Sequence, residues 1–174
     1  MKHYFLLIGA MKAGTSSLHH DLSSLDGVFM TPEKEPNDLA SELVLSDEGK
    51  TRYLNKFKAA NPGDICGDAS TSYSKMPTHP NVPTRAVNVL GRHLKVIYVM
   101  RDPIDRIISH YKHLIMLGLE NRPLNEAVLE DSTYVDYSDY DYQLSFWREV
   151  LPESQILVLQ FEDYIEAPQK VLES

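Results

Sequence analysis

Apolar runs and helical apolar patterns alternate along the chain. The runs are short and rich in Val, Ile and Leu, and each is followed by apolar residues spaced three or four apart. The three pairs are residues 4–8 with 17–25, residues 95–100 with 103–117, and residues 156–159 with 162–172. Nearly continuous apolar strands are typical of parallel sheets covered by helices on both faces. The pattern therefore predicts an α/β fold with three layers, helix on sheet on helix (αβα).

Further segments complete the predicted elements. A short strand is expected over residues 64–67, a helix over 40–59 with an interruption near Ser46, and a helix over 140–151. Residues 130–142 mix aspartates with four tyrosines and lack the regular carboxylate spacing of a calcium loop. We predict a loop there that leads into the following helix.

The helix predicted after residue 102 has a well-defined start. Asp102 is a preferred N-cap residue, and Pro103 suits the first turn. Its apolar residues, which we expect to face the core, are Ile104, Ile107, Ile108, Tyr111, Leu114 and Ile115.

Residues 9–17, with the sequence GAMKAGTSS, connect the first predicted strand to its helix. Gly9 and Gly14 allow a tight turn, and the helix that follows offers unpaired N–H groups and the positive end of its dipole. These features are typical of a phosphate-binding loop, so we expect a P-loop-like sheet. The position after the second glycine holds Thr15 where nucleoside triphosphatases have lysine. The lysine of this loop is Lys12, inside the turn.

A second candidate phosphate contact follows the strand at residues 95–100. Arg101 comes directly after that strand, and Ser109 lies on the second turn of the next helix. The guanidinium group suits bidentate phosphate binding, and the hydroxyl adds a neutral donor. Ligands of parallel sheets bind at the carboxyl ends of the strands, so Lys12 and Arg101 should converge on one edge. The structural alternatives are a salt bridge from Arg101 to a neighbouring aspartate and a solvated Ser109.

Four segments together resemble sulfotransferases that use 3′-phosphoadenosine 5′-phosphosulfate (PAPS), in the branch with heparan sulfate sulfotransferases and bacterial relatives. Residues 9–17 resemble the 5′-phosphosulfate loop, and residues 96–111 resemble the 3′-phosphate motif. Residues 32–36 (PEKEP) resemble the segment that carries the glutamate base of the heparan-type enzymes. Residues 67–73 (GDASTSY) resemble a second segment on the acceptor side. The resemblance extends from the first strand to about Tyr164.

The resemblance implies PAPS as the donor substrate, with no metal required, and assigns roles to these residues. Lys12 would hydrogen-bond the oxygen that bridges sulfur and phosphorus. Arg101 and Ser109 would hold the 3′-phosphate. The remaining donor contacts would come from the loop residues Ala13, Gly14, Thr15, Ser16 and Ser17.

The resemblance also implies that Glu35 is the base that takes the acceptor proton. Asp68 is the alternative base, and an ordinary helix cap explains that residue equally well. For Lys34 and Glu35 the structural alternative is a solvated turn. The family commonly follows the glutamate with a histidine and aromatic residues, whereas this chain has NDL at residues 37–39.

Other residues with possible chemistry receive simpler interpretations. His110 and His113 lie on one predicted helical face, but no cysteine or carboxylate pattern completes a metal site, so we expect a solvated helix surface. Cys66 is the only cysteine, which excludes an intrachain disulfide and favours a small buried apolar residue. A reducing cytoplasm is the expected location.

Size and charge restrict the classes of partner. The chain has 174 residues and a formal net charge of −8, which disfavours binding to nucleic acid, to anionic membranes and, more weakly, to highly sulfated polymers. No stretch approaches the roughly 20 apolar residues of a membrane span. A single sulfotransferase domain is expected over residues 1–174. Because the sequence stops inside a helical pattern, we expect this domain to lack its C-terminal part.

The sequence therefore predicts a PAPS-dependent sulfotransferase that acts on a hydroxyl or amine of a carbohydrate or small-metabolite acceptor. One alternative is a P-loop nucleotide kinase, which the missing lysine after Gly14 and the lack of a clear magnesium-binding aspartate disfavour. The other is a noncatalytic nucleotide-binding relative, which the changed residues 37–39 motivate.

Overall fold

The computed structural model describes residues 2–172, and its centre is a five-stranded sheet in the order β2-β3-β1-β4-β5. Every pair of neighbouring strands is parallel. The strands are β1 (His3–Gly9), β2 (Val28–Met30), β3 (Ile65–Ala69), β4 (Lys95–Met100) and β5 (Ile156–Gln160). The central strands β1 and β4 hold the core, because Leu6, Leu7 and Ile8 are fully buried, as are Val96 and Val99.

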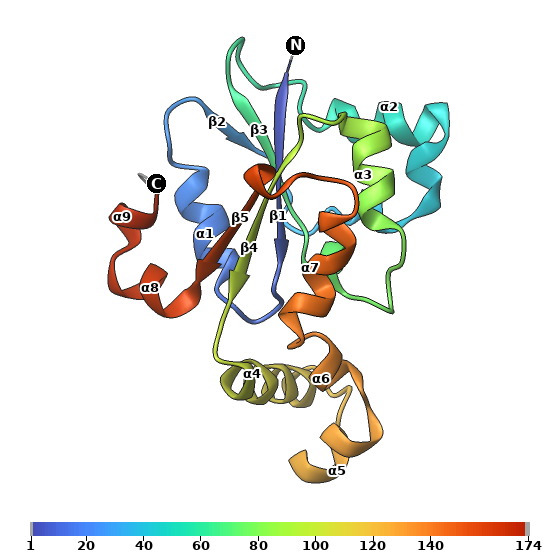
Figure 1. Cartoon of the computed structure of the whole chain (residues 1–174), viewed down its shortest axis with the longest axis vertical. Coiled ribbons are helices and arrows are strands. Elements are labelled where there is room, and N and C mark those ends of the chain that lie inside the picture. Colours follow the sequence, from blue (N-terminus) through green and yellow to red (C-terminus); the bar gives the residue numbers. More distant parts are fainter. Residues whose placement is uncertain (1, 173–174) are drawn as a thin grey trace.

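Helices cover both faces of the sheet. In Figure 1, α1, α8 and α9 lie on one side, and α2, α3 and α7 lie on the other, while α4, α5 and α6 extend past the carboxyl ends of the strands. The α-helices are α1 (Thr15–Leu22), α2 (Asp47–Asn55), α3 (Val82–Leu90), α4 (Pro103–Met116), α5 (Leu124–Glu130), α6 (Thr133–Asp136), α7 (Tyr140–Arg148), α8 (Phe161–Glu166) and α9 (Pro168–Leu172). Short 3₁₀ helices are η1 (Asp38–Ala40), η2 (Glu42–Leu45), η3 (Thr71–Ser74) and η4 (Glu153–Gln155). The predicted three-layer αβα fold is confirmed.

Two predicted boundaries follow from capping residues. Ser46 ends the 3₁₀ turn η2 and caps α2 by accepting a hydrogen bond from the N–H of Gly49, so the predicted interruption of residues 40–59 lies at this serine. Asp102 caps α4 by accepting from the N–H of Asp105, and Pro103 occupies the first turn.

Two other predictions were wrong. Residues 162–172 form two helices, because the chain breaks at Ala167 before Pro168, whose ring disfavours helical geometry in the preceding residue. Residues 130–142 are not a loop, since they contain α6, which packs against α4. Tyr134 and Tyr137 of this segment are buried, which explains its tyrosine content.

The predicted apolar face of α4 was wrong in part, since Ile107, Ile108, Tyr111 and Leu114 are half-buried but the two ends of the stripe are exposed. Ile104 is 64% exposed and Ile115 is 41% exposed, whereas the buried side chains are Arg106 and His110. The Arg106 guanidinium donates to the Tyr134 carbonyl and to the Ser138 hydroxyl. The reason is position: α4 lies beyond the edge of the sheet and packs on α6. No helix within residues 2–172 has the length and apolar character needed to cross a bilayer.

Candidate active site

The loop between β1 and α1 presents unpaired backbone donors. Gly14 precedes the helix with φ of 80°, and no described side chain caps the helix there. The first intrahelical bond at this end runs from the N–H of Leu18 to the Gly14 carbonyl, which leaves the N–H groups of Thr15, Ser16 and Ser17 for a ligand. A Cβ on Gly14 would come within 2.6 Å of the Phe161 ring. The loop therefore needs glycine at this position and has the donors of an anion site.

Arg101 joins this loop to the end of β4. Its Nη1 donates to the Lys12 carbonyl at 3.2 Å, and its guanidinium carbon lies 4.9 Å from the centre of the Phe161 ring. The ion pair that Arg101 forms with Asp105 is long, at 3.8 Å, and Asp105 is largely exposed. Its Nε is buried without a hydrogen-bond partner among the described residues. The guanidinium thus keeps donors for a further ligand.

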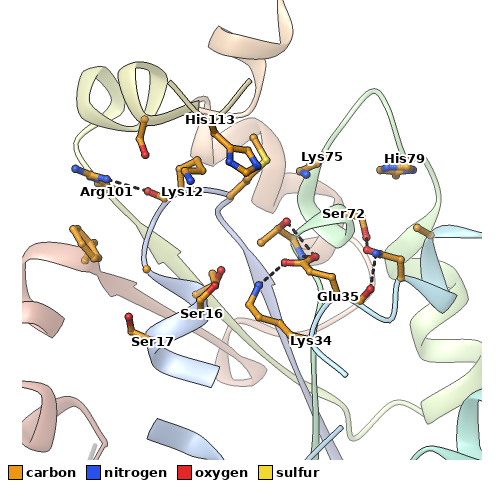
Figure 2. Close-up of a pocket in the computed structure, with 18 residues that line it drawn as sticks. Lys12, Ser16, Ser17, Lys34, Glu35, Ser72, Lys75, His79, Arg101 and His113 are labelled. Atoms are coloured by element: carbon orange, nitrogen blue, oxygen red, sulfur yellow. Dashed lines mark hydrogen bonds and ion pairs between the residues drawn. The ribbon is translucent and has the colours of Figure 1, made fainter. Parts of the chain in front are cut away.

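A cavity of about 850 Å³ contains most of the predicted site residues. Its loop side consists of residues 11–12 and 14–17 together with Arg101, Ser109 and Phe161, and its Lys75 side contains Asn37, Ser72, Lys75 and His79. Figure 2 shows Lys12 and Arg101 on one side and Lys75 and His79 on the other, with Glu35 below Lys75 in this view. The full lining is Met11, Lys12, Gly14, Thr15, Ser16, Ser17, Lys34, Glu35, Asn37, Ala40, Thr71, Ser72, Lys75, His79, Arg101, Ser109, His113 and Phe161.

The charge of this cavity is opposite to that of the chain. Lys12, Lys34, Lys75 and Arg101 are the cationic side chains of the lining, and Glu35 is its carboxylate. A positive cavity in a chain of net charge −8 concentrates the field on one place and attracts anionic ligands there.

Glu35 is fixed inside the cavity. Its Oε2 accepts from the N–H of Thr71 at 2.7 Å and from the Thr71 hydroxyl at 3.3 Å, while its Oε1 accepts from Lys34 Nζ at 2.6 Å. Its own N–H donates to the Ala69 carbonyl at 2.8 Å, which ties the segment to the end of β3. The solvated-turn interpretation is therefore wrong about the position of Glu35.

The residues after Glu35 divide between the cavity and the core. Asn37 lines the cavity, where its side chain accepts from the Ser72 hydroxyl at 2.5 Å and donates to the Glu35 carbonyl at 2.6 Å. Asp38 is buried and forms ion pairs with Lys56 at 3.2 Å and Arg52 at 3.6 Å. Leu39 is fully buried.

Ala13 is the predicted contact residue that the structure places away from the cavity. Its methyl group is fully buried, and its N–H donates to the Ala10 carbonyl at 3.1 Å. Because both groups are occupied within the protein, Ala13 shapes the turn and has no free donor for a phosphate.

Asp68, the alternative base, is sealed in the core. Its carboxylate accepts from Tyr73 at 2.7 Å, Tyr53 at 2.9 Å and Ser70 at 3.0 Å, and the residue has no exposed surface. Burial raises the pKa of Asp68 to about 6, against the opposing effect of these hydrogen bonds. Asp68 does not line the cavity, and its bonds go to side chains, so both the base and the helix-cap interpretations were wrong.

The similarity of this chain to known proteins identifies its family. A family model described as the sulfotransferase domain matches residues 2–174. The chain belongs to the sulfotransferase domain family. The chain is similar to the membrane-associated sulfotransferase kil1 of Dictyostelium discoideum, at 25% identity over 118 residues, which are 68% of this chain and 24% of that protein. It is also similar to the flavonol 4′-sulfotransferase of Flaveria chlorifolia, at 28% identity over 107 residues, which are 57% of this chain and 33% of that protein. Each of these two matches spans a third or less of the length of the relative.

Two solved structures illustrate the shared fold. The sulfotransferase from Alicyclobacillus acidocaldarius superposes with a TM-score of 0.85 at 22% identity, over 98% of this chain and 78% of that chain. The sulfotransferase domain of the Synechococcus PCC 7002 olefin synthase gives a TM-score of 0.58 at 18% identity, over 99% of this chain and 70% of that chain.

Several lining residues of this sulfotransferase domain were missed from the sequence. Lys75, His79 and Phe161 carry no local motif, and only the fold brings them to the loop and to Glu35. A lysine and a histidine four residues apart in the stretch between two predicted elements were the available signal.

The two histidines of α4 differ from the prediction. His110 is buried against the Tyr134 ring, with 4.7 Å between ring centres, and burial followed by Arg106 and Lys75 lowers its pKa to about 4. His113 lines the cavity, and its pKa is lowered by burial and then by Lys12 and Lys75. The expected solvated surface was therefore wrong for His110, whereas His113 is half-buried at the cavity. Within residues 2–172, no three His, Cys, Asp or Glu side chains converge as metal ligands would.

Proposed function

We propose that this chain transfers the sulfuryl group of PAPS to a hydroxyl or amine of a carbohydrate or small-metabolite acceptor. The observation that carries the proposal is the convergence of Lys12, Arg101 and Glu35, from three separate segments, on one positive cavity. Membership of the sulfotransferase family supports sulfuryl transfer in general. The donor and the class of acceptor are part of the proposal.

The donor is expected to lie along the loop side of the cavity. The free N–H groups and hydroxyls at the start of α1 suit the 5′-phosphate, and Arg101 with Ser109 suits the 3′-phosphate. Lys12, inside the turn, is then beside the oxygen that joins sulfur to phosphorus. As that S–O bond breaks, the electron pair goes to the phosphate oxygen, and the ammonium group stabilises the developing charge.

In this proposal, Glu35 is the base that receives the acceptor proton. The acceptor oxygen or nitrogen attacks sulfur, a new bond to sulfur forms, and the products are the sulfated acceptor and 3′-phosphoadenosine 5′-phosphate (PAP). A carboxylate has about four lone-pair sites, of which Thr71 and Lys34 use three, so one remains for the acceptor. The bonds to Thr71 and Lys34 hold the carboxylate in one orientation, as general base catalysis requires.

Lys12→Ala tests the proposed role of the loop lysine. We expect kcat for sulfuryl transfer to fall by about 10²–10³-fold, the range for loss of one donor to a developing oxyanion. The control is Lys58→Ala, which removes an exposed lysine outside the cavity. Equal kcat values in the two variants would contradict the role of Lys12.

Calorimetric titration of the unmodified chain with PAP, with ATP as the comparison ligand, tests the donor. Preferential binding of PAP is expected, because the loop lacks the lysine that would reach a γ-phosphate. Preference for ATP together with magnesium-dependent ATP turnover would contradict the proposal and support the alternative of a P-loop kinase. PAP binding without transfer to any acceptor would identify a noncatalytic relative.

A further inference from the structure

The Lys75 side of the cavity is not used by the donor in the proposed function. It lies beside Glu35 and opposite Lys12 and Arg101, so an acceptor whose reactive group reaches Glu35 would extend toward Lys75 and His79 (Figure 2). The chemistry of this side therefore indicates what kind of acceptor fits.

Lys75 and His79 are held in place by the backbone around them. Lys75 follows η3, and its carbonyl accepts from the N–H of His79 at 2.9 Å, so a single turn brings the two residues together. Gln143, almost fully buried on α7, accepts from the N–H of Met76 at 2.7 Å and donates to the Met76 carbonyl at 3.0 Å. The turn is thus fixed before any ligand binds, which lowers the entropic cost of binding.

The charge of Lys75 has no close anionic partner. Among residues 2–172, no carboxylate lies within 4 Å of its Nζ, whereas Lys34 is paired with Glu35 at 2.6 Å. The Lys75 ammonium lies 5.9 Å from the centre of the Tyr137 ring. Burial lowers the pKa of Lys75, and Arg106 and Lys34 act in the same direction against Glu35. An anion beside the ammonium would stabilise the charged form of Lys75.

His79 also lines the cavity, and its environment favours the neutral imidazole. Its pKa is lowered by burial and then by the positive charges of Lys75 and Arg85. One ammonium and one neutral imidazole match a singly charged oxyanion better than a phosphate dianion. An ammonium group on the acceptor would be repelled by Lys75.

We infer that Lys75 and His79 bind a carboxylate of the acceptor, so that the substrate class is a hydroxyl-bearing carboxylic acid of small size, such as a uronic sugar or a hydroxyaryl acid. This inference rests on the proposed function for the identity of the reactive end. It assigns Lys75 the role of a specificity-determining residue. Asn37 and Ser72, which are hydrogen-bonded to each other, are the other polar residues on the Lys75 side of the cavity.

Matched acids and amides test the inference by binding. The chain saturated with PAP is titrated with glucuronate and glucuronamide, and with 4-hydroxyphenylacetate and 4-hydroxyphenylacetamide, which differ in charge but little in shape. We expect at least one acid to bind about tenfold or more tightly than its amide, the scale of a hydrogen bond to a charged group. Lys75→Gln should abolish the difference, and Lys75→Arg should retain most of it. Lys50→Gln, an exposed lysine outside the cavity, is the control.

The outcomes separate the inference from the proposed function. Equal binding of acids and amides, binding of neither acid, or a preference that persists in Lys75→Gln would overturn the carboxylate site. The same titrations without PAP decide the carboxylate site even if the nucleotide does not bind, a result that would count against the proposed function alone. With active protein, Lys75→Gln should raise KM for the acid, and Lys50→Gln should leave it unchanged.

Discussion

The two sides of the cavity are built in different ways. The loop side is made from one continuous turn and helix start, together with Arg101 at the end of the neighbouring strand, and backbone N–H groups supply much of its binding capacity. The Lys75 side and the adjoining Glu35 are made from side chains of two segments, residues 34–37 and 71–79, which are fixed by hydrogen bonds such as those from Thr71 to Glu35 and from Met76 to Gln143. A backbone site depends on local geometry, whereas a side-chain site depends on packing between distant segments.

This difference separates the expected effects of substitutions. Changes on the loop side should alter nucleotide binding and charge stabilisation. Changes on the Lys75 side should alter acceptor binding and proton transfer, and changes in the core behind it should alter stability. The three predictions below test this separation.

Glu35→Gln should have the largest effect. Glutamine keeps the shape of the side chain and can still accept from the N–H of Thr71, but it cannot take the acceptor proton. We expect kcat to fall by about 10²–10⁴-fold with PAP affinity unchanged, the usual range for loss of a general base. Glu33→Gln, two residues away and largely exposed, is the matched control. Steady-state kinetics and calorimetry together measure both quantities, and a weaker affinity for PAP in Glu35→Gln would show that the two sides are not independent.

Asp68→Asn should change the dependence of stability on pH. The folded pKa of about 6 lies above the ordinary value of 3.8, so the unfolded chain loses this proton first as pH rises. The free energy of unfolding of the wild type therefore falls as pH rises from about 4 to about 6, by up to about 3 kcal/mol in total. The free energy of unfolding of the variant, relative to wild type, should therefore increase by this amount between pH 4 and pH 7.

Urea unfolding at several pH values measures this difference. Asp26→Asn, which removes an exposed aspartate, accounts for the general effect of one lost negative charge. If the difference between Asp68→Asn and wild type is the same at pH 4 and pH 7, burial does not disfavour the ionised carboxylate, and the explanation given for Asp68 is wrong.

Arg101→Ala should have the smallest of the three effects and should be confined to the loop side. Loss of the guanidinium should weaken PAP binding by roughly 1.5–3 kcal/mol, the scale of a hydrogen bond to a charged group. AMP, which lacks the 3′-phosphate, should bind the variant and the wild type alike. The control is Arg92→Ala, at an exposed position outside the cavity. An equal loss of AMP affinity would mean that Arg101 acts through its bond to the Lys12 carbonyl rather than through the 3′-phosphate.

The sequence predicted the loop side better than the Lys75 side, because the loop side depends on local geometry and the Lys75 side depends on packing between distant segments. Strand β4 has the predicted bounds, and Lys12 and Arg101 line one cavity as their positions after strands indicated, together with Ser109 of α4. The predicted donor contact of Ala13 was wrong, because a sequence motif does not show which N–H groups of a turn are already hydrogen-bonded within the protein. The roles of Glu35 and of the donor contacts stay predictions.

Where several segments pack together, the sequence pattern misled. The apolar spacing of α4 indicated a core face, yet Arg106 and His110 are the buried residues, because α4 packs beyond the sheet on Tyr134 of α6 and on Tyr137, which follows α6. Asp68 looked like an accessible carboxylate, but Tyr53 and Tyr73 enclose it. Neither arrangement could be derived from spacing, since each depends on residues distant in sequence.

The sequence by itself determined the parallel αβα architecture and the phosphate loop, because strand and helix periodicity, glycines in a tight turn and helix caps are all local effects. Only the tertiary structure decided which carboxylate faces the cavity and which is buried, and that Lys75 and His79 lie opposite Arg101. The physical reason is that burial and electrostatic environment are set by the packing of segments that the chain brings together only on folding.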